Sequence, residues 1–97
     1  MTPCIEEARR LLRLAERDYR TFLILRGHPN AELEPTCFHA QQAAEKALKA
    51  ALIARSTDFR RTHDLEELAN LLADLGVALP FTSREFRRLN PFAVELR

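Results

Sequence analysis

Residues 35–54 read PTCFHAQQAAEKALKAALIA, and this stretch decides the fold class. Small apolar side chains recur in it at steps of three and four residues, which is the spacing of one helix face. These positions are Cys37, Ala40, Ala44, Ala47 and Ala51, with Leu48 and Leu52 beside them. Alanine on a helix face lets a neighbouring helix approach closely. The stretch therefore predicts a helix over 35–54 that packs between its sequence neighbours.

Residues 3–26 carry the same periodicity. Thr2 can cap a helix here, Pro3 suits its first position, and Gly27 ends it. The apolar stripe of this segment consists of Ile5, Ala8, Leu12, Ala15, Tyr19 and Phe22. Because the loop that follows is short, we expect this helix to lie antiparallel to the next one.

A third helix is expected to start near Thr62 or Asp64. Asp64 followed by Glu67 fits a capping box, in which two side chains satisfy free backbone N–H groups of the first turn. Gly76 is typical of the residue just after a helix end. The apolar stripe between these signals consists of Leu65, Leu68, Leu72 and Leu75.

A short fourth helix is expected from about Ser83 to Leu89, and Pro91 predicts a break at Asn90. No segment shows the sustained alternation of a β-strand. The prediction is therefore an all-α, up-and-down bundle of about four helices that forms a single domain over residues 1–97.

The composition limits the classes of function. The chain has 97 residues, of which 46% are apolar, and 15 basic against 14 acidic residues give a net charge of +1. This balance excludes attraction of the whole chain to a polyanion, but it does not exclude a local basic patch. No apolar run approaches the ~20 residues of a membrane span, and the N-terminus lacks a secretory signal. We therefore expect a cytoplasmic protein with no membrane partner.

The cysteines and histidines predict neither a disulfide nor a metal site. Cys4 and Cys37 begin two antiparallel helices, so a helix length of ~30 Å separates them. His28, His39 and His63 have no ligand spacing with each other or with the cysteines. We expect no metal and no cofactor.

One side of the 35–54 helix is a candidate for partner binding. Opposite the alanine stripe, a helical wheel places Phe38, Gln42, Lys46 and Ile53, together with Glu45 and Lys49. Two large apolar groups among charges suggest a second contact surface, such as a dimer interface. The alternative is that Phe38 packs under the loop between the first two helices. Gln41 lies on the apolar side, where we expect it to make a buried hydrogen bond.

A second candidate is the basic stretch over residues 55–63, which reads RSTDFRRTH. It precedes a helix N-terminus, where backbone N–H groups favour anions, and its arginines could clamp a phosphate. The candidate residues for binding a nucleotide or phosphate are Arg55, Arg60, Arg61 and His63. The alternative is a solvated connector in which Arg60 or Arg61 pairs with an acidic neighbour, namely Asp58, Glu66 or Glu67.

Three stretches resemble the HEPN family (higher eukaryotes and prokaryotes nucleotide-binding domain). Residues 37–50, CFHAQQAAEKALKA, resemble the signature of its second helix and are the most specific match. Residues 62–68, THDLEEL, resemble the segment that opens its third helix, and residues 89–97, LNPFAVELR, resemble the stretch before its last helix. The matches come in the family's order.

The resemblance implies an all-α bundle that is usually a homodimer. It also implies a partner, commonly a minimal nucleotidyltransferase, in a two-gene system that often behaves as a toxin–antitoxin pair. Family members continue into a Tyr-Pro turn and a further helix, whereas this sequence stops at Arg97. We therefore expect a HEPN-like bundle that lacks the usual last helix.

Some family members are metal-independent RNases with four to six residues between a functional Arg and His. Here seven residues separate Arg20 from His28, and seven separate Arg55 from His63. No pair fits, so enzymatic activity stays open. The leading hypothesis is a protein that dimerises and binds a nucleotidyltransferase, a nucleotide or RNA phosphate. The alternatives are an RNase with an atypical Arg–His spacing and a helical adaptor without a ligand.

Overall fold

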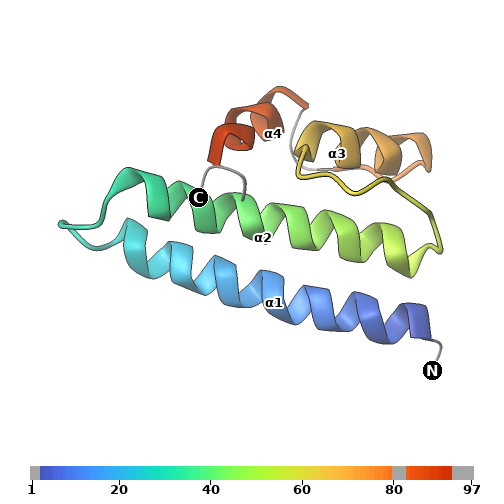
Figure 1. Ribbon diagram of the computed structural model, residues 1–97, viewed down its shortest axis with the longest axis horizontal. Helices are drawn as coiled ribbons and strands as arrows, with labels where there is room; N and C mark the ends of the chain where they lie inside the picture. Colours follow the sequence, from blue (N-terminus) through green and yellow to red (C-terminus); the bar gives the residue numbers. More distant parts are fainter. Residues whose placement is uncertain (1–2, 80–82, 93–97) are drawn as a thin grey trace.

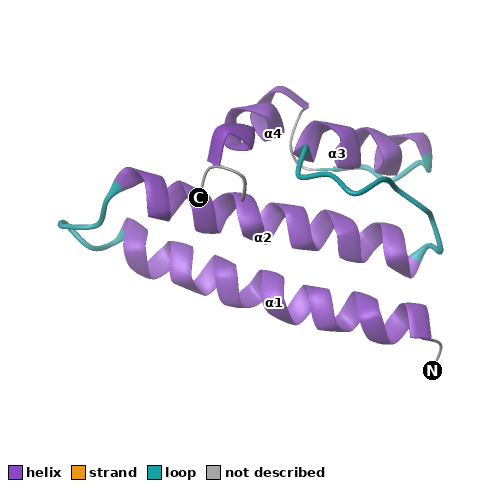
Figure 2. Cartoon of the chain, in the orientation of Figure 1, coloured by secondary structure: helices purple, strands orange, loops and turns teal. Residues whose placement is uncertain are grey.

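The computed structural model describes residues 3–79 and 83–92 of the chain. It contains helices α1 (Pro3–Arg26), α2 (Leu33–Ala54), α3 (Leu65–Asp74) and α4 (Ser83–Leu89), and a short 3-10 helix η1 (Asn90–Phe92). Figure 2 shows these helices joined by loops, with no strand in the described residues. The all-α prediction is confirmed, and the predicted break at Asn90 coincides with the end of α4.

The helices are arranged in layers around α2 (Figure 1). Helices α1 and α2 run antiparallel, while α3 and α4 lie on the other side of α2. Helix α2 therefore lies between its sequence neighbours, as its periodicity predicts. Helix α1 is an edge helix, and its far side faces away from the rest of the described chain.

The ends of α3 follow local rules. Oδ1 of Asp64 accepts hydrogen bonds from the backbone N–H groups of Glu66, at 3.0 Å, and Glu67, at 3.3 Å. The second half of the predicted capping box does not form, because the Glu67 carboxylate binds Arg60 instead. Gly76 has a φ of +83°, the left-handed conformation that glycine adopts after a helix end. The N-cap and the glycine stop are confirmed.

Helix α2 begins at Leu33, two residues before the predicted start at Pro35. Pro35 falls within the first turn, where backbone N–H groups have no partner inside the helix, so it costs no hydrogen bond. The predicted cap at Thr2 lies outside the described residues.

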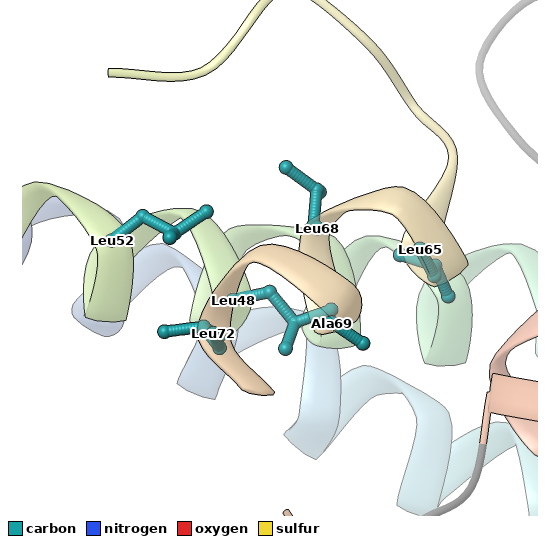
Figure 3. Packing of buried hydrophobic residues seen from close by; sticks show 6 residues of the cluster. All are labelled: Leu48, Leu52, Leu65, Leu68, Ala69 and Leu72. Atoms are coloured by element: carbon teal, nitrogen blue, oxygen red, sulfur yellow. The ribbon is translucent and has the colours of Figure 1, made fainter. Parts of the chain in front are cut away.

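The apolar core lies between α2 and α3. Figure 3 shows its six side chains packed together, and they are Leu48, Leu52, Leu65, Leu68, Ala69 and Leu72. Four of these leucines have no exposed surface at all. The leucines beside the alanine stripe of α2 therefore meet the leucine stripe of α3, and this contact holds the two helices together.

The contact between α1 and α2 is more extensive but buries smaller side chains. Ala8 and Ala15 are the buried residues of α1, and Ala50 is buried on α2. Leu12 and Tyr19 belong to the predicted apolar stripe of α1, yet 47% and 54% of their surfaces are exposed. The stripe on α1 is covered along one edge and open along the other.

Both cysteines are free. Cys4 lies near the start of α1 and Cys37 near the start of α2, which are opposite ends of an antiparallel pair (Figure 1).

Candidate functional site

An apolar groove of about 530 Å³ runs between α1, α2 and α4. Large side chains from α1 form one wall, alanines from α2 form the floor, and the end of α4 closes one side. The lining residues are Leu12, Ala15, Glu16, Tyr19, Phe22, Ala40, Ala43, Ala44, Ala47, Glu85 and Leu89. This volume is within the range of protein ligand sites, and only two of its lining side chains are charged.

The groove corrects the prediction for the alanine stripe. Ala44 and Ala51 of the stripe pack against the core shared with α3, as expected, whereas Ala40, Ala44 and Ala47 also line an open surface. Ala47 is itself exposed. Ala15 of α1 is buried and also lines the groove, so α1 contacts one edge of the stripe and leaves the rest open.

On the opposite side of α2, a network of polar side chains is buried against the start of α3. Gln41 has no exposed surface, and its amide donates to Oε1 of Glu45 at 2.9 Å. Nδ1 of His63 lies 3.1 Å from both carboxylate oxygens of Glu45, and Lys49 donates to the same carboxylate at 3.0 Å. Gln42 donates to Gln41 at 2.7 Å. The buried hydrogen bond predicted for Gln41 is confirmed.

The network shifts the ionisation of Glu45. Burial raises the pKa of this carboxyl and is the largest single influence on it. Hydrogen bonds from Gln41, His63 and Lys49, together with the charge of Lys49, outweigh burial and lower the pKa below its ordinary value. Glu45 is therefore held as a carboxylate that orients His63. Because Nδ1 of His63 donates to this carboxylate, the other ring nitrogen is left as the acceptor in the neutral form.

The four residues predicted to form a partner-binding face on α2 have different surroundings in the structure. Gln42 is 7% exposed, and Lys46 donates to Asp18 of α1, so neither presents a free side chain outward. Both side chains are engaged within the chain, and their role at a partner interface stays a prediction. Phe38 and Ile53 are half-buried. The Phe38 ring packs edge-on against the neighbouring His39 ring, with the ring centroids 5.2 Å apart.

Asp18 also ties α1 to α2 through His39. Nδ1 of His39 lies 2.9 Å from Oδ1 of Asp18, whose other oxygen accepts from Lys46. The Asp18 side chain is 12% exposed. This three-residue cluster fixes the register of the two long helices, and no feature of the sequence predicted it, because it joins residues 21 and 28 positions apart.

The candidate phosphate residues do not form one cluster. Arg60 binds both oxygens of Glu67, at 2.8 and 2.7 Å, and this interaction raises the pKa of the guanidinium above its ordinary value. Arg55 donates to the backbone carbonyl of Ala51 at 3.0 Å. Arg61 is exposed, and His63 belongs to the buried network. For Arg60, the alternative of a pair within the connector is the one observed.

The N-terminus of α3 is already occupied. Asp64 caps two of its N–H groups, and Oδ1 of Asn90 accepts from the backbone N–H of Leu65 at 3.0 Å. Asn90 also donates to Asp64 at 3.0 Å. A hollow of about 250 Å³ lined by Thr62, His63, Asp64 and Asn90 lies at this point. The capping carboxylate removes the positive end of the helix that the phosphate prediction relied on.

The described part of the chain comprises residues 3–79 and 83–92. Within them, no group of three His, Cys, Asp or Glu side chains is placed to bind a metal ion. Within them, too, no helix combines the length and apolar character needed to span a membrane.

The fold and the groove define a small all-α domain with an apolar surface that the described residues leave open. A family model described as HEPN domain matches residues 4–97. No match was found among curated proteins or among solved structures. Since the family model covers nearly the whole chain, this protein belongs to the HEPN domain family.

Proposed function

We propose that this HEPN protein is a non-catalytic or weakly catalytic binding module that forms a homodimer through its apolar groove. The open groove is the observation that carries the proposal. Apolar hollows of this kind are places where proteins bind ligands or partners. Four of the six large apolar residues that are well exposed in the described chain lie on α1.

The shape of the groove favours a second copy of the chain. One wall carries large side chains, Leu12 and Tyr19, and the floor carries alanines such as Ala40 and Ala47. If α1 of one copy lies on the α2 floor of its partner, large side chains meet small ones, and a twofold axis repeats the contact. Each surface is then used twice in a twofold-symmetric interface.

Oligomeric state tests this proposal directly. Sedimentation equilibrium of the chain should give a dimer, and Leu12→Glu should give a monomer, because a carboxylate in the groove would be desolvated without a partner. Leu33→Glu is the matched control, since Leu33 is 70% exposed and lies outside the groove. A monomeric wild type at high concentration, or equal behaviour of the two variants, contradicts the proposal.

The family resemblance supplies the rest of the proposed role. It supports a minimal nucleotidyltransferase as the second component of a toxin–antitoxin-like two-gene system. Coexpression with the product of the neighbouring gene, followed by copurification, tests this. A neighbouring product that is no nucleotidyltransferase, or that does not copurify, removes this part of the proposal and leaves the dimer intact.

Binding of a nucleotide or RNA phosphate is a second candidate function, favoured by the orientation of His63. Glu45 holds Nδ1 of His63, and the hollow around Thr62 lies beside it. Arg55 and Arg61 remain candidate ligands, while Arg60 would first have to leave Glu67. Amide chemical shifts during titration with ATP or short RNA should move at residues 55–63. An unchanged spectrum favours the ligand-free adaptor.

An RNase activity based on Arg55 and His63 is the catalytic version of this candidate. Incubation with RNA in EDTA, beside His63→Ala, tests it. Loss of cleavage in the variant supports the activity. No cleavage, or equal cleavage by both proteins, contradicts it.

A further inference from the structure

The outer face of α1 carries a row of arginines that neither the groove nor the polar network uses. The row consists of Arg9, Arg13, Arg17 and Arg20, which follow one another at steps of four, four and three residues. This spacing places them on one side of the helix, over a length of ~16 Å at 1.5 Å per residue. That side faces away from α2, since Ala8 and Ala15 are buried on the opposite side of the helix.

The four side chains are exposed, and none of them has an ion-pair partner among the described residues. Arg10, their neighbour, is by contrast bound to Glu7 at 2.6 Å. The nearest acidic groups are Glu6, one turn before the row, and Glu16, which lines the groove. The row is therefore a strip of concentrated positive charge, although the net charge of the chain is only +1.

Much of the compensating negative charge is held elsewhere. Asp18 is bound by His39 and Lys46, and Glu45 is bound by Lys49 and His63. Both lysines of the chain thus form ion pairs with buried or half-buried carboxylates. The cations left exposed along α1 are all arginines, whose forked guanidinium groups bind phosphate oxygens in pairs.

We propose that the arginine row of α1 binds the phosphodiester backbone of a nucleic acid strand. A straight helix holds the four charges in a fixed line, which suits a linear polyanion. The exposed Ile24 lies one turn beyond Arg20 on the same side, whereas the turns from Arg9 to Arg20 present four guanidinium groups. Backbone binding to nucleic acid rests on charge, which the four arginines supply without an apolar anchor. This site does not depend on the proposed homodimer, because the row and the groove occupy different sides of α1.

The salt dependence of binding measures the number of phosphates neutralised. Four contacts to a single strand give a slope of about −2.8 in log K against log salt, so affinity should fall ~50-fold between 50 and 200 mM salt. Fluorescence anisotropy with a labelled 20-nucleotide single-stranded RNA is the measurement. Parallel titrations with single-stranded DNA and with duplex RNA show which nucleic acid is preferred. If the row binds a single strand, duplex RNA should bind no more tightly than single-stranded RNA.

Two variants that each remove four positive charges provide the contrast. In the first, Arg9, Arg13, Arg17 and Arg20 are all replaced by Gln, and affinity at 50 mM salt should fall at least tenfold, with a smaller slope. In the control, Arg26, Arg84, Arg87 and Arg88 are replaced by Gln, and affinity should stay within about threefold. All eight residues are exposed, and glutamine suits a helix, so circular dichroism should be unchanged.

Three results would overturn the assignment. Equal losses in the two variants would show that only the net charge matters, and a larger loss in the control would place binding elsewhere. Equal competition by a polyglutamate peptide of the same charge would indicate an acidic protein partner. Absence of binding to RNA and DNA at 50 mM salt would remove the site.

Discussion

Helix α2 has two apolar sides that meet very different surroundings. Towards α3, Leu48 and Leu52 are buried against the leucines of α3 (Figure 3). Towards the groove, Ala40 and Ala47 face open space beside the half-exposed Leu12 of α1. Small side chains on one helix allow a second helix to come close. Apolar surface is buried there only if the second helix brings large side chains. The closed core therefore supplies the stability of the monomer, and the groove is the part that association can use.

The largest expected effect is the loss of a core leucine. Leu68→Ala removes a side chain with no exposed surface and should lower the free energy of unfolding by about 2–5 kcal/mol. Urea denaturation followed by circular dichroism measures it. Leu33→Ala is the control, since 70% of Leu33 is exposed, and it should change stability by less than about 0.5 kcal/mol. A loss below about 1 kcal/mol in Leu68→Ala would mean that the core is elsewhere.

Breaking the buried polar network should cost somewhat less. Glu45→Gln keeps the shape of the side chain but removes the charge that Lys49 and His63 share, and it should destabilise the fold by about 1–3 kcal/mol. Chemical denaturation at pH 7 is the measurement. Glu66→Gln is a suitable control, because its carboxylate is on the surface and binds the exposed Arg87. Equal effects of the two substitutions would show that burial of the network contributes nothing.

The same network predicts a direction for acid destabilisation. The pKa of Glu45 is lowered in the folded chain, so its stabilising contribution is fully present above the ordinary value of 4.5. It is lost as the pH falls from that value through the lowered pKa of the folded state. The stability difference between wild type and Glu45→Gln should therefore be steady near neutrality and shrink below pH 4.5. A difference that grows on acidification would contradict this sign.

Loss of the α3 cap should have a smaller effect. Asp64→Ala removes the acceptor for the N–H groups of Glu66 and Glu67 and should cost about 1 kcal/mol in a thermal or urea melt. Asp64→Asn retains a capping oxygen and should lie within a few tenths of a kcal/mol of wild type. If Asp64→Asn lowers stability as much as Asp64→Ala, the charge of Asp64 stabilises the helix and its capping hydrogen bonds do not.

Local signals in the sequence predicted the helices well. Asp64 and Gly76 mark the ends of α3, and the leucine stripe gives the side that α3 buries. The side of α2 that stays open was not predicted, because a helical wheel sorts positions into faces but does not say which neighbour covers each face. That depends on how helices cross, which is set by contacts distant in sequence.

The polar network was predicted only in part. Gln41, Glu45 and Lys49 follow one another at steps of four residues, and Lys49 pairs with Glu45 at 3.0 Å. The helical wheel placed Glu45 on the candidate partner face, yet its side chain is only 7% exposed. The link to His63 spans 18 residues and depends on the path of the 55–64 connection. The arginine row was also visible in the sequence as four residues of one charge at helical spacing. That the whole face is exposed could be seen only from the way α1 packs against α2.

The smallest expected effect in the monomer is truncation within the groove. Leu12 is 47% exposed, so Leu12→Ala gives up little buried surface and should lower the unfolding free energy of the dilute chain by less than about 1 kcal/mol. At high protein concentration the cost should rise, because association stabilises only the folded state and the variant associates less. Melts of wild type and variant across a 100-fold concentration range measure this. A wild-type midpoint independent of concentration would mean that no second copy fills the groove. A Leu12→Ala cost as large in dilute solution as that of Leu68→Ala would mean that the groove is closed in the monomer, and the contrast between the two sides of α2 would disappear.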